Sequence, residues 1–254
     1  MTTASAVIEL ELVHLFFPHN LFELEGGSRF LAAHGSEPAL STGVIADEWR
    51  AVLAQAAPVY RAHFWPEHER RDRAYIEAVR PQLAAHGAWL ARRLEVVYRS
   101  SWPAAPVVVE VTPAVPPFGA STVGEPPFTG PHTPLITVSS EDPGYTTDTG
   151  LEMIFHEASH MLVDNVQTAL ETSAQRQARK LPDRFWHFLL FYTAGHLVRE
   201  RLGPDYVPYA ERPANTIFSG RFAAYLPILE RAWQPYLDGQ VDLEPAIDAV
   251  VASF

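Results

Sequence analysis

The chain of 254 residues has no cysteine, one lysine (Lys180) and no long uninterrupted apolar run. Without cysteine there is no disulfide, no thiolate nucleophile and no Cys-ligated metal site. The net charge of -11 disfavours a broad phosphate-binding surface, so nucleic acid is not expected as a partner. No stretch approaches the roughly 18 apolar residues of a membrane span, so none is expected.

The N-terminal stretch from Met1 to Asn20 has no basic segment and carries Glu9 and Glu11 within its apolar part. These features are unlike those of a signal peptide. The chain as it stands is therefore expected in the cytoplasm, or in the periplasm or medium if a signal segment was removed from a precursor. Composition leaves the compartment and the oligomeric state open.

With 47% hydrophobic and 19% charged residues, the chain can bury a large core. We expect a single catalytic domain of two lobes, residues 1–160 and 161–254. The first lobe reads as largely helical up to about Trp102, because apolar residues recur at helical spacing over Ile45–Tyr60 and Tyr75–Tyr98. Pro81 is expected to end or kink the second of these helices. The arginines between Arg70 and Arg99 are interpreted as a solvated face paired with glutamates.

Two short β-branched segments bounded by prolines, Pro106–Pro113 and Pro134–Ser140, predict strands. The segment between them is rich in proline and glycine and predicts a long loop, either a flap over a site or a surface excursion. Phe118 and Phe128 are its candidate contacts if it covers a site. His132 is a candidate substrate contact, or simply an exposed loop histidine.

Three helices are expected after the second strand. Thr149 and Glu152 form a capping box that starts the first helix, which should run through His160. A second helix is expected over 165–180. A third should begin near Pro182 and end at Gly203, and its nearly continuous apolar surface predicts burial. The whole pattern predicts an α+β fold, mostly helical, with a small sheet ahead of these helices.

The segment Phe155–His160, FHEASH, carries the strongest chemical signal. On a helix, His156 and His160 lie on one face a turn apart, so that both rings can reach one cation. Glu157 lies about 100° further round, where it can reach a metal-bound water without being a ligand. Zn²⁺ lowers the pKa of such a water to roughly 7, and Glu157 would then act as the general base of a hydrolysis.

The HEASH motif on a helix that follows a strand resembles the zincin metallopeptidases, and a further ligand on a later helix is similar to the gluzincin branch. The resemblance covers roughly residues 134–203, and only the five-residue motif is specific. The glycine and third histidine of the metzincin extension are absent. The resemblance implies that His156 and His160 bind zinc, that Glu157 is the general base, and that strand Leu135–Ser139 lines the cleft and pairs with an extended substrate.

A catalytic zinc needs three protein ligands and one open position. The candidates for the third ligand are Glu171, His187, His196 and Glu200. His196 is favoured because it follows Gly195 and shares a polar face with Tyr192, Arg199 and Glu200. Glu200 is kept as the alternative. His187 shares its face with Leu190, Phe191, Ala194 and Val198, and is interpreted as a core histidine.

Two further roles are assigned within the same region. Asp164 is a candidate hydrogen-bond partner of a ligand histidine, or else a solvated residue at a helix end. Tyr209 is the candidate that stabilises the oxyanion, chosen from the four residues Tyr192, Arg199, Tyr206 and Tyr209.

The sequence therefore predicts a zinc-dependent hydrolase, favoured as a peptidase acting on peptides or small proteins. Two alternatives stay open: a non-catalytic zinc-binding or scaffold protein with a zincin fold, and a zinc hydrolase of non-peptide amides or esters. Glu157 separates the catalytic from the non-catalytic hypotheses, because only a catalyst needs it.

Overall fold

The computed structural model describes residues 8–12, 55–56, 58–104, 107–113, 115, 119–123 and 135–254. Over these residues the chain is mostly helical with a small sheet, which confirms the α+β prediction. None of the described helices is long and apolar enough to cross a membrane. The flap contacts Phe118 and Phe128, the loop residue His132 and most of the helix predicted from Ile45 lie outside the described residues.

Internal contacts divide the chain into two units, residues 1–88 with 103–157 and residues 89–102 with 158–254. The division after Glu157 lies close to the predicted lobe boundary after residue 160. The segment 89–102 groups with the second unit, although it is far earlier in the chain. That the two units act as a single catalytic domain stays a prediction.

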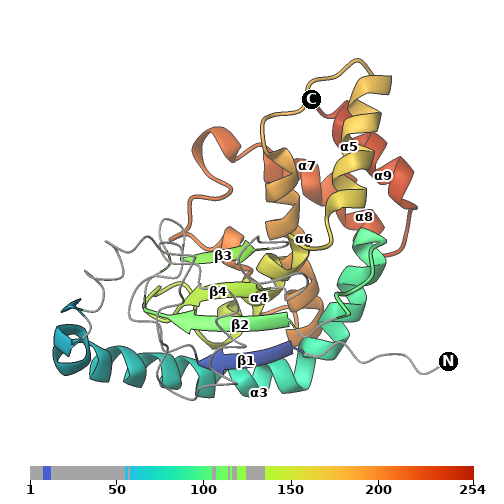
Figure 1. Ribbon diagram of the computed structural model, residues 1–254. Coiled ribbons are helices and arrows are strands. Elements are labelled where there is room, and N and C mark those ends of the chain that lie inside the picture. Colours follow the sequence, from blue (N-terminus) through green and yellow to red (C-terminus); the bar gives the residue numbers. More distant parts are fainter. Residues whose placement is uncertain are drawn as a thin grey trace. The chain divides into compact units, whose positions relative to one another are not determined.

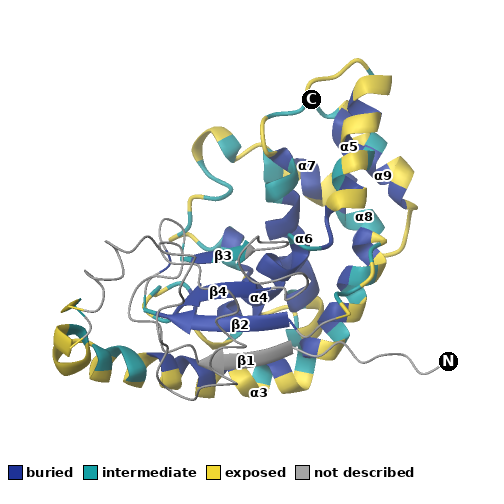
Figure 2. Ribbon diagram, in the orientation of Figure 1, coloured by how far each residue is buried: buried dark blue, intermediate teal, exposed yellow. Residues whose placement is uncertain are grey.

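The first unit is built on a four-stranded sheet of order β1-β2-β4-β3 (Figure 1). Strands β1 and β2 are parallel, as are β2 and β4, whereas β3 runs antiparallel to β4. The β2 and β4 residues are buried along their whole length, as Figure 2 shows, which is typical of parallel strands covered on both faces. The strands are β1 (Ile8–Leu12), β2 (Val107–Thr112), β3 (Ala120–Val123) and β4 (Leu135–Ser139).

Strands β2 and β4 confirm the two predicted strands, but β1 and β3 were not predicted. Strand β3 lies within the segment predicted to be a loop, and β1 lies within the lobe predicted to be largely helical. Strand β4 is hydrogen-bonded to β2 on one side and to β3 on the other. The prediction that Leu135–Ser139 pairs with an extended substrate is therefore wrong, because neither of its edges is free.

Helix α3 (Trp65–Tyr98) is continuous for 34 residues and contains Pro81. The proline therefore does not end the helix. Its ring is on the exposed side, while Val79 and Leu83 on either side are buried. The cost of one missing backbone hydrogen bond is offset by burial along the rest of this long helix. The predicted solvated face is present, since Arg70 and Arg71 both pair with Glu67.

Asp72 on α3 is fully buried and accepts a hydrogen bond of 2.5 Å from the Ser140 hydroxyl. Its second oxygen, Oδ2, has no hydrogen-bond partner among the described residues. Burial raises the pKa of Asp72 to about 7, against the opposing effect of Ser140, and the charges of Glu141 and Glu69 raise it further. The folded protein therefore binds the Asp72 proton more tightly than the unfolded chain does.

We expect Asp72→Asn to flatten the pH dependence of stability. The contribution of the Asp72 proton is complete below the unfolded pKa near 3.8 and is lost as the pH rises through about 7. At pH 8 the variant should be more stable than the wild type by about 2–4 kcal/mol, and near pH 4 the two should be similar. Denaturant unfolding of the metal-free protein at both pH values measures this. The exposed Asp183→Asn serves as control, and equal curves for Asp72→Asn and wild type would contradict the expectation.

Helix α4 (Thr147–Ser159) begins two residues before the predicted N-cap. Thr149 lies inside the helix, where its hydroxyl donates to the Thr146 carbonyl at 3.1 Å, so the predicted capping box is wrong in position. Gly150 is required by the close approach of α3. A Cβ at this position would lie 2.8 Å from the Tyr75 hydroxyl and 3.0 Å from Val79 Cγ2. This contact fixes α4 against α3 within the first unit.

The second unit is helical. Helix α5 confirms the second predicted helix, and α6 confirms the third, with Gly203 directly after its last residue at φ 113°. Residues Leu189–Val198 of α6 are buried, as predicted from its apolar surface (Figure 2). The elements are α5 (Asp164–Arg176), α6 (Phe185–Leu202), η2 (Tyr209–Glu211), η3 (Gly220–Phe222), α7 (Tyr225–Ala232), α8 (Gln234–Leu237) and α9 (Leu243–Ala252).

Helix α6 is fixed in the second unit by buried hydrogen bonds as well as by apolar contacts. Trp233 is fully buried and donates from Nε1 to the Thr193 hydroxyl at 2.9 Å. The Tyr192 hydroxyl donates to Gln234 Oε1 at 2.6 Å. A buried donor that kept no partner would cost about 1–3 kcal/mol, so these pairs set the rotation of α6 about its axis. That rotation decides which α6 side chains lie on the side of the helix that carries His187.

Candidate metal centre

The HEASH residues lie at the C-terminal end of α4. His156 and Glu157 are in its last turn, and both are buried. The helix ends at Ser159, and His160 opens a tight turn in which Met161 N donates to the Ala158 carbonyl at 3.1 Å. His160 therefore follows His156 by one turn of continuous backbone, so both rings can face the same side.

The third histidine of the group is His187, in the first turn of α6. The rings of His160 and His187, both in the second unit, have centroids 5.1 Å apart. His156, His160 and His187 each offer a ring nitrogen, and these nitrogens lie within 4.8 Å of one another. Within the described part of the chain, no other set of three or more histidines and carboxylates meets this criterion.

This donor set suits a zinc ion. Three histidines with one open position is a known arrangement for catalytic zinc. The three ring nitrogens would hold the ion after small inward movements of the rings, since bonds from zinc to histidine nitrogen are about 2.0–2.1 Å long. Burial lowers the pKa of His160 to about 4, with contributions from His187 and Arg184, and burial and Arg184 lower that of His187 to about 4. Both imidazoles are thus neutral near pH 7, as ligands must be.

Glu157 directly follows His156 in the chain and is not part of this group. Only 5% of its surface is exposed, and burial raises its pKa to about 7, against the opposing effect of a hydrogen bond from Thr122. The Thr122 hydroxyl, on β3, is 2.6 Å from Glu157 Oε2. A buried carboxyl group with a raised pKa is suited to accept and release a proton near neutral pH.

The structure does not bring His196, the favoured third ligand, into the histidine group. His196 stacks on Tyr192 with ring centroids 6.2 Å apart, and its Nε2 lies 3.1 Å from Asp238 Oδ1. Residues nine apart on a helix project about 180° from each other, so His187 and His196 cannot both face one ion. The geometry replaces His196 with His187 as the candidate ligand.

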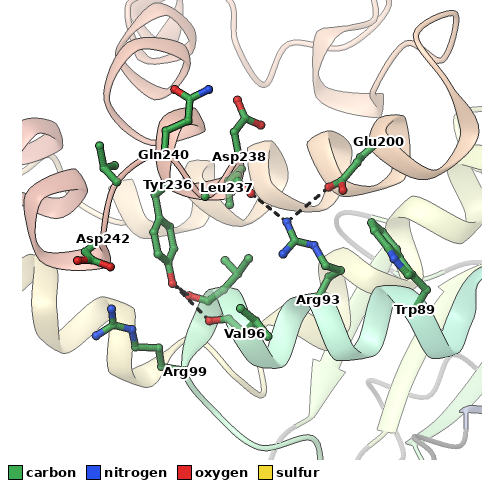
Figure 3. Close-up of a pocket in the computed structure, with 13 residues that line it drawn as sticks. Trp89, Arg93, Val96, Arg99, Glu200, Tyr236, Leu237, Asp238, Gln240 and Asp242 are labelled. Carbon is green, nitrogen blue, oxygen red and sulfur yellow. Dashed lines mark hydrogen bonds and ion pairs between the residues drawn. The ribbon is translucent and has the colours of Figure 1, made fainter.

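Glu200, the alternative ligand, is also outside the group. It is about half exposed and lies 3.5 Å from Arg93 Nη2. Figure 3 shows Glu200, Arg93 and Asp238 around a separate pocket of the second unit. The volume of this pocket is about 700 Å³. Within that pocket Arg93 also donates to the Leu237 carbonyl at 2.9 Å. Glu200 is thus part of an ion pair near the C-terminal end of α6, whereas His187 lies in the first turn of the same helix.

Tyr209 is half-buried and stacks on Phe191 with ring centroids 6.3 Å apart, and Phe191 contacts the His187 ring at 5.1 Å. Tyr209 therefore contacts the ring that contacts the third histidine, and its role as oxyanion stabiliser stays a prediction. Asp164 and Glu171 are both exposed on α5, so Asp164 matches its solvated alternative and Glu171 is not in the histidine group.

The other candidates for oxyanion stabilisation have partners elsewhere. The Tyr192 hydroxyl is bonded to Gln234, and Arg199 pairs with Glu211 at 3.0 Å. Tyr206 is buried, and Arg212 lies over its ring at 5.9 Å from the centroid. Tyr209 contacts a neighbour of the histidine group, because it stacks on Phe191.

Comparison with known proteins adds no further identification: no family model, no curated protein and no solved structure matches this chain.

Proposed function

We propose that the protein is a zinc-dependent hydrolase of the zincin type that cleaves peptides or small proteins. The observation that carries the proposal is the group of His156, His160 and His187, together with the buried Glu157 that directly follows His156 in the chain. Three neutral imidazoles supply the zinc ligands and leave one position open. Glu157, the buried carboxyl group that follows His156 in the chain, supplies the base. A purely structural zinc site needs four ligands and no such carboxyl group.

The three histidines would hold the zinc ion, which when bound acidifies water and polarises a carbonyl group. Glu157 removes a proton from the attacking water as the water oxygen bonds to the carbonyl carbon. Glu157 then delivers this proton to the leaving nitrogen as the carbon–nitrogen bond breaks. Tyr209 is the proposed donor to the oxygen that becomes negatively charged in between.

The sheet supports the zincin-type part of the proposal. Strand β4 is the element that directly precedes α4 in the chain. The antiparallel strand β3 pairs with β4 at one edge of the described sheet. In the described part of the sheet, β3 has one edge that pairs with no other strand. An extended peptide can add to such an edge through main-chain hydrogen bonds. We therefore transfer to β3 the substrate-binding role that the sequence suggested for β4.

We expect the purified protein to bind one equivalent of zinc and to hydrolyse members of a quenched-fluorescence peptide library. Removal of the metal by a chelator should abolish turnover, and addition of one equivalent of zinc should restore it. Metal analysis by mass spectrometry and initial rates before and after dialysis measure both effects.

A fully zinc-loaded protein that cleaves no peptide in the library would contradict peptidase activity. Chromogenic ester and non-peptide amide substrates, tested on the same sample, then decide whether the centre is hydrolytic at all. Failure to bind zinc in stoichiometric amount would overturn the proposal at its first step.

A further inference from the structure

The Thr122 hydroxyl makes two close contacts with Glu157, a residue 35 positions later. Its Oγ1 lies 2.6 Å from Glu157 Oε2 and 2.8 Å from the Glu157 backbone oxygen. Both residues belong to the first unit. The 2.6 Å contact has the length typical of a hydroxyl that donates to a carboxylate. A side chain of the sheet thus bonds directly to the candidate general base.

This hydroxyl is the sole hydrogen-bonding partner of the Glu157 carboxyl group within the part of the chain that the structure describes. A buried Glu has three side-chain torsions, and without a fixed partner its carboxylate can take several directions. The bond to Oε2 removes that freedom. It leaves the other oxygen, Oε1, available to the reacting water.

The position of Thr122 is itself fixed by the sheet. Strand β3 pairs with β4 in a register that places Ser121 opposite Thr137 and Thr122 opposite Ile136. A hydroxyl held on a paired strand is positioned more accurately than one on a loop. A shift of one residue in this register would turn the Thr122 side chain to the other face of the sheet. The pairing of β3 and β4 therefore decides where the Glu157 carboxylate points.

We propose that Thr122 is a positioning residue for the proposed hydrolytic reaction: its hydroxyl holds Glu157 Oε2 and directs Oε1 towards the water that is deprotonated. The inference rests on the proposed function of Glu157 as general base. Thr122 keeps its own proton throughout. The water proton moves to Oε1 and then to the leaving nitrogen, so Thr122 acts only through Glu157.

Thr122→Val tests the proposal, because valine keeps the β-branched shape and strand preference and removes only the hydroxyl. We expect kcat to fall about 10- to 100-fold, since small errors in the placement of a reacting group cost rates of this order. KM should change by less than about twofold, and one equivalent of zinc should still bind. Thr122→Ser keeps the hydroxyl and should restore kcat to within a few-fold of wild type.

Thr137→Val is the matched control. It makes the same chemical change in the same sheet, at a buried threonine whose hydroxyl has no hydrogen-bond partner among the described residues. We expect its kcat to stay within about twofold of wild type, because it loses no hydrogen bond. A fall in kcat for Thr137→Val as large as that for Thr122→Val would overturn the proposal, since general damage to the sheet would then explain both.

A second readout does not need turnover. Crystal structures of wild type and Thr122→Val should show one Glu157 side-chain conformer in the wild type and a displaced or divided one in the variant. An unchanged Glu157 in the variant, or an unchanged kcat, overturns the role of Thr122 while the hydrolase proposal stands. If instead the wild type hydrolyses nothing, the proposed function fails, and the two structures still decide whether Thr122 orients Glu157.

Discussion

Glu157→Gln should reduce kcat by about 10³- to 10⁴-fold while one equivalent of zinc stays bound. The glutamine has the same size as the glutamate and keeps an oxygen that can accept the Thr122 hydrogen bond, but it cannot take a proton from water. A general base contributes about 10²- to 10⁴-fold to a rate, and Glu157 here serves both proton transfers of the reaction. Glu157 is not a member of the histidine group, so zinc binding should not depend on Glu157.

Rates with the best peptide substrate and metal analysis of the same samples measure the two quantities. Glu152→Gln is a matched control, because Glu152 is also buried on α4, five residues before Glu157. It should bind zinc and keep most of the activity. Loss of zinc in Glu157→Gln would mean that Glu157 is a ligand. Full activity in Glu157→Gln would favour another base and remove the main support for the zincin-type mechanism.

The helices and strands that the sequence predicted correctly are those with a strong pattern and clear boundaries. Strands β2 and β4 are β-branched and bounded by prolines, and α6 is apolar with Gly203 at its end. Strand β3 has only four residues within a segment rich in proline and glycine, so its own pattern was too short to detect. Strand β1 alternates in the order IELEL, and this period of two could have indicated a strand.

The candidate site could be predicted from local sequence spacing only in part. The relation of His156 to His160 follows from a single helical turn, so spacing was enough to predict it. The third histidine depends on how α6 is rotated, and that rotation is set by partners far along the chain, such as Trp233 with Thr193. His187 has apolar neighbours on its helix and was interpreted as a core residue, yet its ring is packed against His160.

The location of Glu157 near a hydroxyl on β3 could not be predicted for the same reason. The sequence interpretation treated residues 114–133 as one loop, so no rigid element was available there to contact α4. The antiparallel pairing of β3 with β4 brings Thr122 to Glu157. In both cases the missing information is tertiary: the identities of the residues were visible, but the elements that bring them together were not.

His187→Ala should weaken zinc binding by at least about 100-fold, whereas His196→Ala should leave it within a few-fold of wild type. Loss of an outer hydrogen-bond partner already costs 10- to 100-fold in metal affinity, and loss of one of three ligands should cost more. His196 is bonded to Asp238 and is not in the histidine group, so its removal affects the second unit without touching the ligands.

The two variants form a matched pair, because both remove a histidine from α6, and the two histidines project from opposite sides of the helix. Competition with a chromophoric chelator at pH 7 measures the affinities, and circular dichroism of each metal-free variant checks that the helices are retained. Weaker zinc binding in His196→Ala with normal binding in His187→Ala would support His196 as the third ligand, as the polar face of α6 first suggested. Equal, small effects in both would mean that zinc is held by His156 and His160 with a ligand outside α6, and the three-histidine centre would then be wrong.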